Sequence, residues 1–124
     1  MKNFKTLMRI FFGVFLLFFG LNGFLQFMPM PEVGPQAGAF LGALASTKLF
    51  FPVISVVEII VGALLIVNKA VPLVLIIIFP ILVCAVLFHL SLDPAGILFA
   101  IIGLVLNILL LITNQEKYLP LIKL

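Results

Sequence analysis

Two ionisable residues inside long apolar runs are the first candidates for chemistry in this chain. Glu58 lies near the middle of such a run, nine residues from either end. A carboxylate at that depth in a bilayer costs at least about 2.5–3.5 kcal/mol, so it must face protein or water, form a pair or be protonated. Glu58 could exchange a proton, anchor the polar head of a ligand, or only fasten helices. We expect a functional role, with Glu58 neutral at pH 7.

His89, the single histidine, lies near one end of another apolar run. It could titrate or donate to a ligand carbonyl, or it could be bonded to the following loop or to Asp93, four residues on. We expect Asp93 to cap the next helix, with Pro94 in its first turn. Asn22 and Gln26, one helical turn apart, could meet Glu58 or His89 in a polar pocket or could be merely interfacial.

Several other activities lack the residues that they need. Cys84 is the only cysteine, which excludes an intramolecular disulfide and a C-x-x-C pair. It lies about 140° from His89 around a helix, so we expect an inert, buried thiol and no nucleophile–base pair. One histidine with scattered carboxylates makes no metal site. The seven Lys and Arg lie at segment ends and form no patch, so we expect no nucleic-acid partner.

The segments that position these residues are predicted to be membrane-spanning helices. The chain is 65% hydrophobic and 9% charged, whereas a soluble domain carries about 25% charged residues. A helix needs roughly 20 apolar residues to cross about 30 Å of hydrocarbon. The first apolar run is too long for the core of a signal peptide, so we expect it to be retained. The four runs of this length are Leu7–Met28, Leu49–Val67, Val71–Leu92 and Gly96–Thr113.

The connections between these runs predict an antiparallel four-helix bundle. Only residues 68–70 and 93–95 join the last three runs, so these helices must be antiparallel neighbours. The first loop, Pro29–Lys48, contains an apolar segment, Gln36–Thr47, that is too short to span. We expect an interfacial or re-entrant helix there, over the mouth of the bundle; the alternative is a loose loop. The fold class is therefore an all-α, integral membrane bundle in one domain, residues 1–124.

Lys and Arg near the ends of the runs predict the orientation. Six lie on one side, against Lys48 alone on the other: Lys2, Lys5, Arg9, Lys69, Lys117 and Lys123. Because positive residues are enriched in cytoplasmic segments, both termini are predicted to be cytoplasmic and the first loop to face outward. We expect a multi-pass protein of the cell membrane, the inner membrane in a bacterium.

Small residues at helical spacing predict which helix faces pack together. Gly13 and Gly20 lie one heptad apart, and Ser55, Glu58 and Gly62 share a face of the second run. In the last run the corresponding stripe is Gly96, Ala100, Gly103 and Asn107. Such stripes let helices approach closely in lipid, so we expect Asn107 to point inward.

These motifs together resemble the DoxX-like family of small four-helix membrane proteins, over nearly the whole chain. The resemblance implies a related bundle and marks Glu58, His89 and Asp93, with Asn22 behind them. Founding members of that family look like subunits of a thiosulfate:quinone oxidoreductase; others are associated with thiol and superoxide defence, or with receptor assembly. The matching residues are Arg9, Gly13, Gly20, Asn22 and Gly23; Gly34-Pro35 and Phe51-Pro52; Val57, Glu58 and Gly62; and Phe88-His89, Asp93-Pro94 and Gly96.

Three functions follow as hypotheses. The first is a membrane subunit of a redox-associated complex that binds a quinone or a similar apolar ligand in an outward-facing pocket, oriented by Glu58, His89 and Asn22. The second is a non-catalytic assembly factor or complex subunit that uses its glycine stripes to contact a membrane protein partner or a second copy of itself. The third is a carrier of lipids or small molecules. Whether the protein is an enzyme stays open at this point.

Overall fold

The computed structural model describes residues 2–28 and 32–123, with the side chain of Lys2 excepted, and this part of the chain is all helical. The prediction of an all-α fold is confirmed for it. Pro29 and Pro31 of the predicted first loop lie outside the described residues. The elements are α1 (Lys2–Leu25), α2 (Pro35–Ser46), α3 (Phe50–Ile66), α4 (Val71–Leu92), η1 (Pro94–Gly96), α5 (Ile97–Thr113), η2 (Gln115–Lys117) and α6 (Leu119–Ile122).

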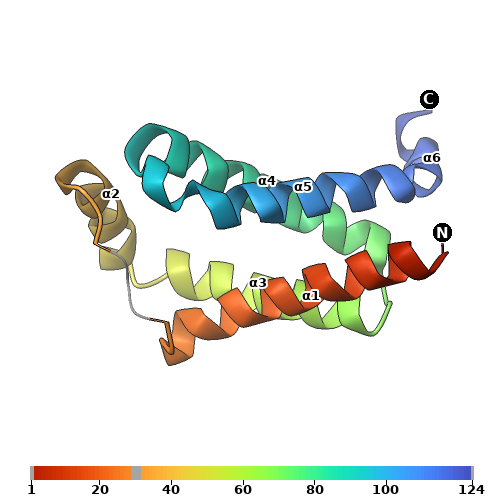
Figure 1. Cartoon of the computed structure of the whole chain (residues 1–124), viewed down its shortest axis with the longest axis horizontal. Coiled ribbons are helices and arrows are strands. Elements are labelled where there is room, and N and C mark those ends of the chain that lie inside the picture. The colour runs from red at the N-terminus through yellow and green to blue at the C-terminus, as the bar shows by residue number, and fades with distance from the viewer. Residues whose placement is uncertain (1, 29–31, 124) are drawn as a thin grey trace.

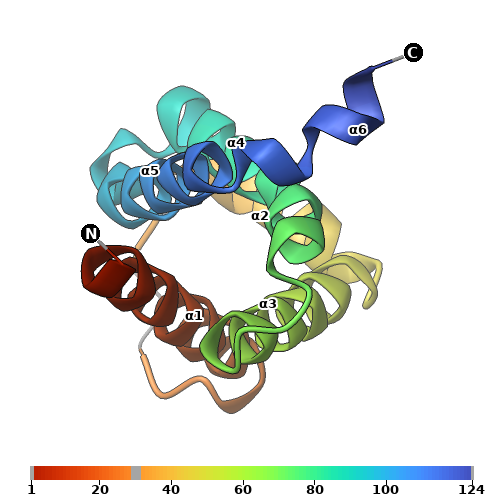
Figure 2. The same cartoon turned by 90° about the vertical axis from the view of Figure 1, so that its right-hand side faces the viewer.

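The four long helices, α1, α3, α4 and α5, lie side by side in two pairs. α1 packs along α3 and α4 packs along α5, while contacts of α1 with α5 and of α3 with α4 close the ring (Figures 1 and 2). Both termini lie at one end, here called the terminal end (Figure 1). The short helix α2 lies across the opposite end, the α2 end, so the predicted helix in the first loop is present.

Glycines bring α1 and α3 into close contact. A methyl group added to Gly62 would lie 2.7 Å from the carbonyl oxygen of Gly13, and one added to Gly13 would lie 2.8 Å from that of Gly62. Two turns after Gly13 in α1, a methyl group added to Gly20 would lie 2.9 Å from the carbonyl oxygen of Ser55. Because these neighbours are backbone atoms, a side chain at these positions would force the helices apart.

The tightly packed core lies between the middle of the helices and the terminal end. The predicted inward stripe of the last helix is confirmed for Ala100, Gly103 and Asn107, which are buried, whereas Gly96 lies in η1 and is only partly buried. The amide nitrogen of Asn107 donates to the carbonyl oxygen of Leu75 in α4, at 3.1 Å. The largest fully buried side chains are Phe12, Leu16, Val61, Leu65, Leu75, Ile78, Asn107 and Leu110.

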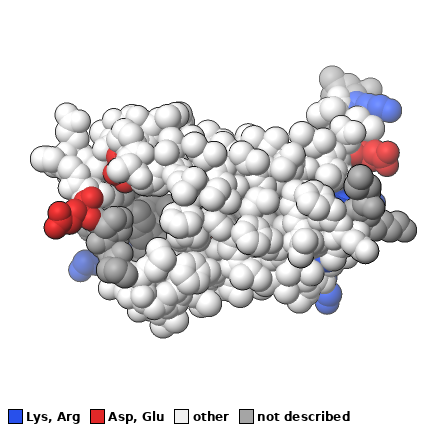
Figure 3. Space-filling view, viewed as in Figure 1, with Lys and Arg blue, Asp and Glu red and all other residues white. Residues whose placement is uncertain are grey.

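The outer surface has the character of a membrane protein. Charged side chains gather at the two ends on the face shown in Figure 3, and the broad band between them carries none. Three described helical segments are long and apolar enough to cross a membrane: Asn3–Leu25, Val71–Leu92 and Pro94–Thr113. α3 has only 17 residues, and it makes a fourth span when it is taken together with α2, from which it is bent by 84°.

Candidate functional site

Glu58 lies on the side of α3 that faces the other helices. The exposed line of α3 runs through Val53, Val56 and Ile60, and Glu58 is on the opposite side by helical geometry. Among the described residues its carboxyl group has no hydrogen-bond or ion-pair partner. The one fully buried polar side-chain atom without a partner in that part of the chain belongs to Asn107. The Glu58 oxygens therefore keep some accessible surface.

Glu58 also marks the depth at which the tight core ends. One and two turns toward the terminal end, Val61 and Leu65 are 2% and 0% exposed. Toward the α2 end, Ile54 and Val57 are only partly buried, although Ser55 between them is still buried, at 6% exposed. We call the segments of the long helices between Glu58 and the α2 end the α2 half. Burial along α3 is thus lower from Glu58 toward the α2 end, and Figure 3 shows the surface hollowed beside α2 at that end.

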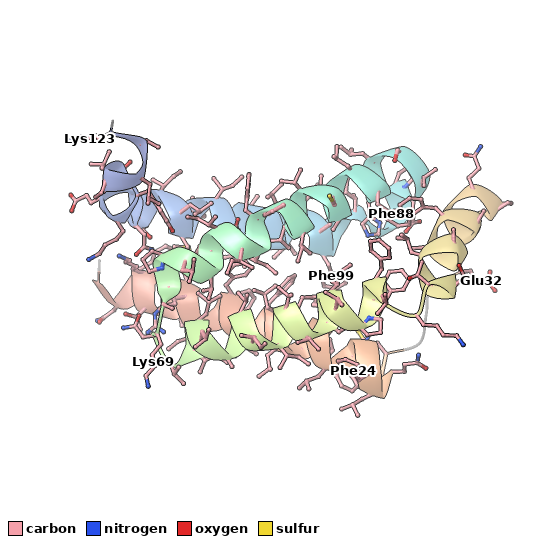
Figure 4. All side chains as sticks on the ribbon, turned by 180° about the vertical axis from the view of Figure 1, so that it is seen from behind. Phe24, Glu32, Lys69, Phe88, Phe99 and Lys123 are labelled. Atoms are coloured by element: carbon pink, nitrogen blue, oxygen red, sulfur yellow. The ribbon has the colours of Figure 1, made fainter. Side chains whose placement is uncertain are left out.

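Aromatic side chains line this α2 half. The rings of Phe15 and Phe19 in α1 are 4.9 Å apart, and Phe19 lies 5.6 Å from Phe99 of α5. Phe40 of α2 stacks on Phe88 of α4 at 5.6 Å, which ties the short helix to the bundle. Figure 4 shows Phe88 and Phe99 pointing from α4 and α5 toward the opposite helix pair. Because Phe99 is 54% exposed, this set of aromatic contacts extends from the interior to the outer surface of the bundle.

Phe19 and Glu58 lie at about the same depth. Gly20, the residue after Phe19, contacts Ser55 and Ile59, which flank Glu58 on α3. The carboxyl group is thus level with the aromatic cluster. Such a combination of apolar walls and one convergent polar group is typical of sites for small apolar ligands.

His89 is held at the α2 end by its neighbour in the chain. Its Nδ1 lies 3.2 Å from Oδ2 of Asp93 and 3.1 Å from the Asp93 carbonyl oxygen. Since both are acceptors, Nδ1 is assigned as a proton donor in this contact. His89 shares the inward side of α4 with Ile78 and Leu82. The structure therefore favours the alternative in which His89 is bonded to Asp93.

The expectation that Asp93 caps the next helix is wrong. Asp93 stands at the N-cap position and Pro94 occupies the first turn as predicted, but the Asp93 side chain makes no capping hydrogen bond. Its carboxylate is turned to His89 instead. Gly96 permits this arrangement, because a methyl group there would lie 2.6 Å from Asp93 Oδ2 and 2.9 Å from His89 Cε1.

Asn22 has a local role that the sequence did not indicate. Its side-chain oxygen accepts a hydrogen bond from the backbone N–H of Met28 at 2.9 Å, and its carbonyl accepts one from Gln26, also at 2.9 Å. Gln26 is exposed, with a left-handed φ of 51°. Asn22 thus ends α1 and turns the chain, and in the described part of the structure no hydrogen bond joins it to Glu58 or His89.

Cys84 is exposed, not buried as predicted. It lies on the outward side of α4, around the helix from His89, because Pro80 and Leu87 on the same side are exposed as well. The separation of the thiol from the histidine is as predicted. Across residues 2–28 and 32–123, no three His, Cys, Asp or Glu side chains gather as a metal site would require.

Arg9 is a structural residue whose contacts the sequence analysis missed. Its guanidinium donates from Nη1 to the carbonyl oxygens of Leu65 and Ile66, at the end of α3. Both carbonyls lie in the last turn of α3, where the regular helical hydrogen bonds end, and a cation complements the negative end of the helix dipole. The sequence feature that could have indicated this role is the position of Arg9, a basic residue two turns inside the helix, next to apolar residues.

Comparison of the chain with known protein families, with curated proteins and with solved structures gives no match. The resemblance to the DoxX-like family therefore stays a prediction from the motifs. What the protein does has to be argued from the site itself.

Proposed function

We propose that this protein spans the cell membrane four times, with both termini in the cytoplasm, and binds a quinone or a similar apolar ligand in the α2 half. The fourth span is α3, with α2 lying at the outer surface. Lys5, Arg9, Lys69, Lys117 and Lys123 belong to the terminal end and Lys48 to the α2 end, which supports this orientation by the positive-inside rule. Figure 4 shows Lys69 and Lys123 at the same end.

The observation that carries the proposal is the contrast between the two halves of the bundle. The layer of the core just beyond Glu58, at Val61 and Leu65, is closed, whereas around Glu58 most of α3 is only partly buried and aromatic side chains lie at the same depth. A ligand that enters from the outer leaflet would therefore stop at the depth of Glu58. A neutral Glu58 would donate a hydrogen bond to a ligand carbonyl, as a protonated carboxyl group can.

The residues of the α2 half fit a quinone head group. Aromatic rings such as those of Phe19 and Phe88 suit a flat, apolar ring, and His89 with Glu58 offers hydrogen bonding at two depths. A bound quinone would supply the redox chemistry, while the protein would hold it and exchange protons. A place in a redox-associated complex rests on the DoxX-like resemblance.

The assembly-factor alternative was suggested by glycine stripes that could contact a partner protein. Gly13, Gly20, Gly62 and Gly103 are all used in contacts within the chain. They are not available as a surface for another membrane protein. The carrier hypothesis gains no specific support from the arrangement, so ligand binding near Glu58 remains the better proposal.

Native mass spectrometry of gently purified protein tests the proposal. We expect a quinone to be retained by the wild type and by Glu32→Gln, a matched change of an exposed acid. Glu58→Gln replaces the neutral O–H donor by a differently placed amide and should weaken retention by roughly three- to tenfold, the value of one hydrogen bond. Failure of the wild type to retain any quinone, or equal retention by Glu58→Gln, would contradict the proposal.

A further inference from the structure

A second site is suggested by a cavity at the terminal end, far from Glu58. Its volume is about 400 Å³, and its walls come from the start of α1, the turn between α3 and α4, and the region after α5. This is many times the roughly 30 Å³ that one water molecule occupies in the liquid. The polar side chains of the wall are Lys5, Thr6, Arg9, Asn68, Asn114 and Lys117.

The cavity wall carries three cations and no acid. Lys5, Arg9 and Lys117 come from two segments that are remote in sequence, so the fold gathers their charges. None of them forms an ion pair with an acid of the described residues, where the single such pair joins His89 and Asp93. Glu116 is exposed and is not part of the wall. The electrostatic potential in the cavity must therefore favour an anion.

Hydrogen-bond donors remain available in the cavity. Arg9 uses only Nη1 for the end of α3, which leaves Nη2 and Nε. Lys5 makes one contact, from Nζ to the carbonyl oxygen of Thr113 at 3.4 Å. The amide of Asn68 can add a neutral donor, whereas that of Asn114 already donates to the carbonyl oxygen of Leu110 at 2.8 Å. Guanidinium, ammonium and amide groups together are the donors that phosphate oxygens accept from.

One wall of the cavity is fixed by a contact across the bundle. The hydroxyl of Tyr118, next to Lys117, donates to the carbonyl oxygen of Pro72 at the start of α4, at 2.8 Å. Partial burial raises the pKa of the Tyr118 phenol, so the group keeps its proton and remains a donor. The segment that carries Lys117 is thereby held against the first turn of α4.

We propose that this basic cavity binds the phosphate group of an anionic phospholipid from the cytoplasmic leaflet. The terminal end lies at the depth of the lipid head groups once the four helices span the membrane. Phe4 and Leu7 are strongly exposed on the adjacent turns of α1 and can contact acyl chains. Basic pockets between helices on the cytoplasmic side are known to bind such head groups. This proposal rests on the membrane topology of the proposed function, but it does not depend on whether a quinone binds near Glu58.

A pair of double variants with equal charge tests this site. Lys5→Gln with Lys117→Gln removes two cations from the cavity, whereas Lys69→Gln with Lys123→Gln removes two from the same end outside its wall. Arg9 is left in place because it also caps α3. Binding of phosphatidylglycerol, phosphatidylcholine and inorganic phosphate to each purified protein is measured by native mass spectrometry.

We expect phosphatidylglycerol to bind wild type and the Lys69/Lys123 variant with similar affinity, and to bind the Lys5/Lys117 variant about thirtyfold more weakly, since each lysine near the membrane surface contributes about 1 kcal/mol. Phosphatidylcholine should bind weakly to all three. Equal losses in both double variants would show diffuse attraction and overturn the proposal. Inorganic phosphate that displaces the lipid at equal concentration would also overturn it, in favour of a soluble anion.

Discussion

At the scale of single residues, Glu58 and His89 differ in how their positions are fixed. His89 is held through Nδ1 by Asp93, and the absence of a side chain on Gly96 leaves room for that contact. Glu58 has no partner of this kind in the described part of the chain and lies where the tight core ends. Under the proposed function, the fixed group near the α2 end and the unpaired group deeper in the bundle would bind two polar positions of one ligand.

Cys84→Ser should leave stability and ligand retention almost unchanged. The thiol is exposed on the outward side of α4 and has neither a cysteine partner nor an activating base, so its loss removes no chemistry. The change should alter stability by no more than about 0.5 kcal/mol, as for most surface positions. Thermal unfolding in detergent and native mass spectrometry check this. Loss of ligand from a well-folded variant would revive a thiol mechanism.

The positions of the polar side chains were only partly predictable from the sequence. The inward positions of Glu58 and Asn107 were predictable, because each shares a helical face with small residues. The hydrogen-bond partners of the Asp93 and Asn22 side chains were not predictable. Each of these side chains can accept a hydrogen bond from more than one nearby donor. Which donor it bonds depends on the geometry of the loop, which the spacing of residues in the sequence does not determine. The exposure of Cys84 was missed because apolar residues in a membrane face lipid as readily as protein.

At the scale of helices, the contact between α1 and α3 depends on facing glycines. Gly62→Ala should destabilise the protein by about 1–3 kcal/mol, because the added methyl group meets backbone atoms of α1 that cannot move independently. The matched control is Gly42→Ala in α2, where no atom lies within 4 Å of the added methyl group. It should be neutral or slightly stabilising, since alanine favours helix.

Thermal unfolding of both alanine variants in the same detergent compares them directly. A Gly62→Ala protein that is as stable as Gly42→Ala would contradict the close contact of α1 with α3.

The helices themselves were largely predictable from apolar run length. The observed bounds of α3, α4 and α5 differ from the predicted runs by one residue at most. α1 ends three residues earlier than its run, at Leu25, because Asn22 turns the chain there. The helix α2 was expected from its apolar, small residues, but its bend of 84° to α3 was not, because no local signal sets the angle between two helices.

At the scale of the whole molecule, the distribution of charge predicts the topology. Reporter fusions at Asn68 and at Lys123 should both report a cytoplasmic position, and a fusion at Thr47 an external one. The reason is the excess of Lys and Arg at the terminal end, which is retained in the cytoplasm during insertion. An external signal at Asn68 or Lys123 would exclude the four-span arrangement proposed above.

The central claim is that the bundle is open from the outside down to Glu58 and closed in the next layer of the core, at Val61 and Leu65. Single cysteines in a Cys84→Ser background test it, using Glu58→Cys with two controls on the same helix. Ile60→Cys lies on the exposed, lipid-facing side, and Val61→Cys lies in the tight core. A thiol must be in contact with water to ionise and react.

The decisive measurement is the rate at which a membrane-impermeant, charged thiol reagent modifies each variant from the outer face of intact cells. We predict that Glu58→Cys is modified, that an added quinone slows its modification, and that Ile60→Cys and Val61→Cys stay unmodified. A Glu58→Cys thiol that reacts no faster than that of Val61→Cys would contradict the account.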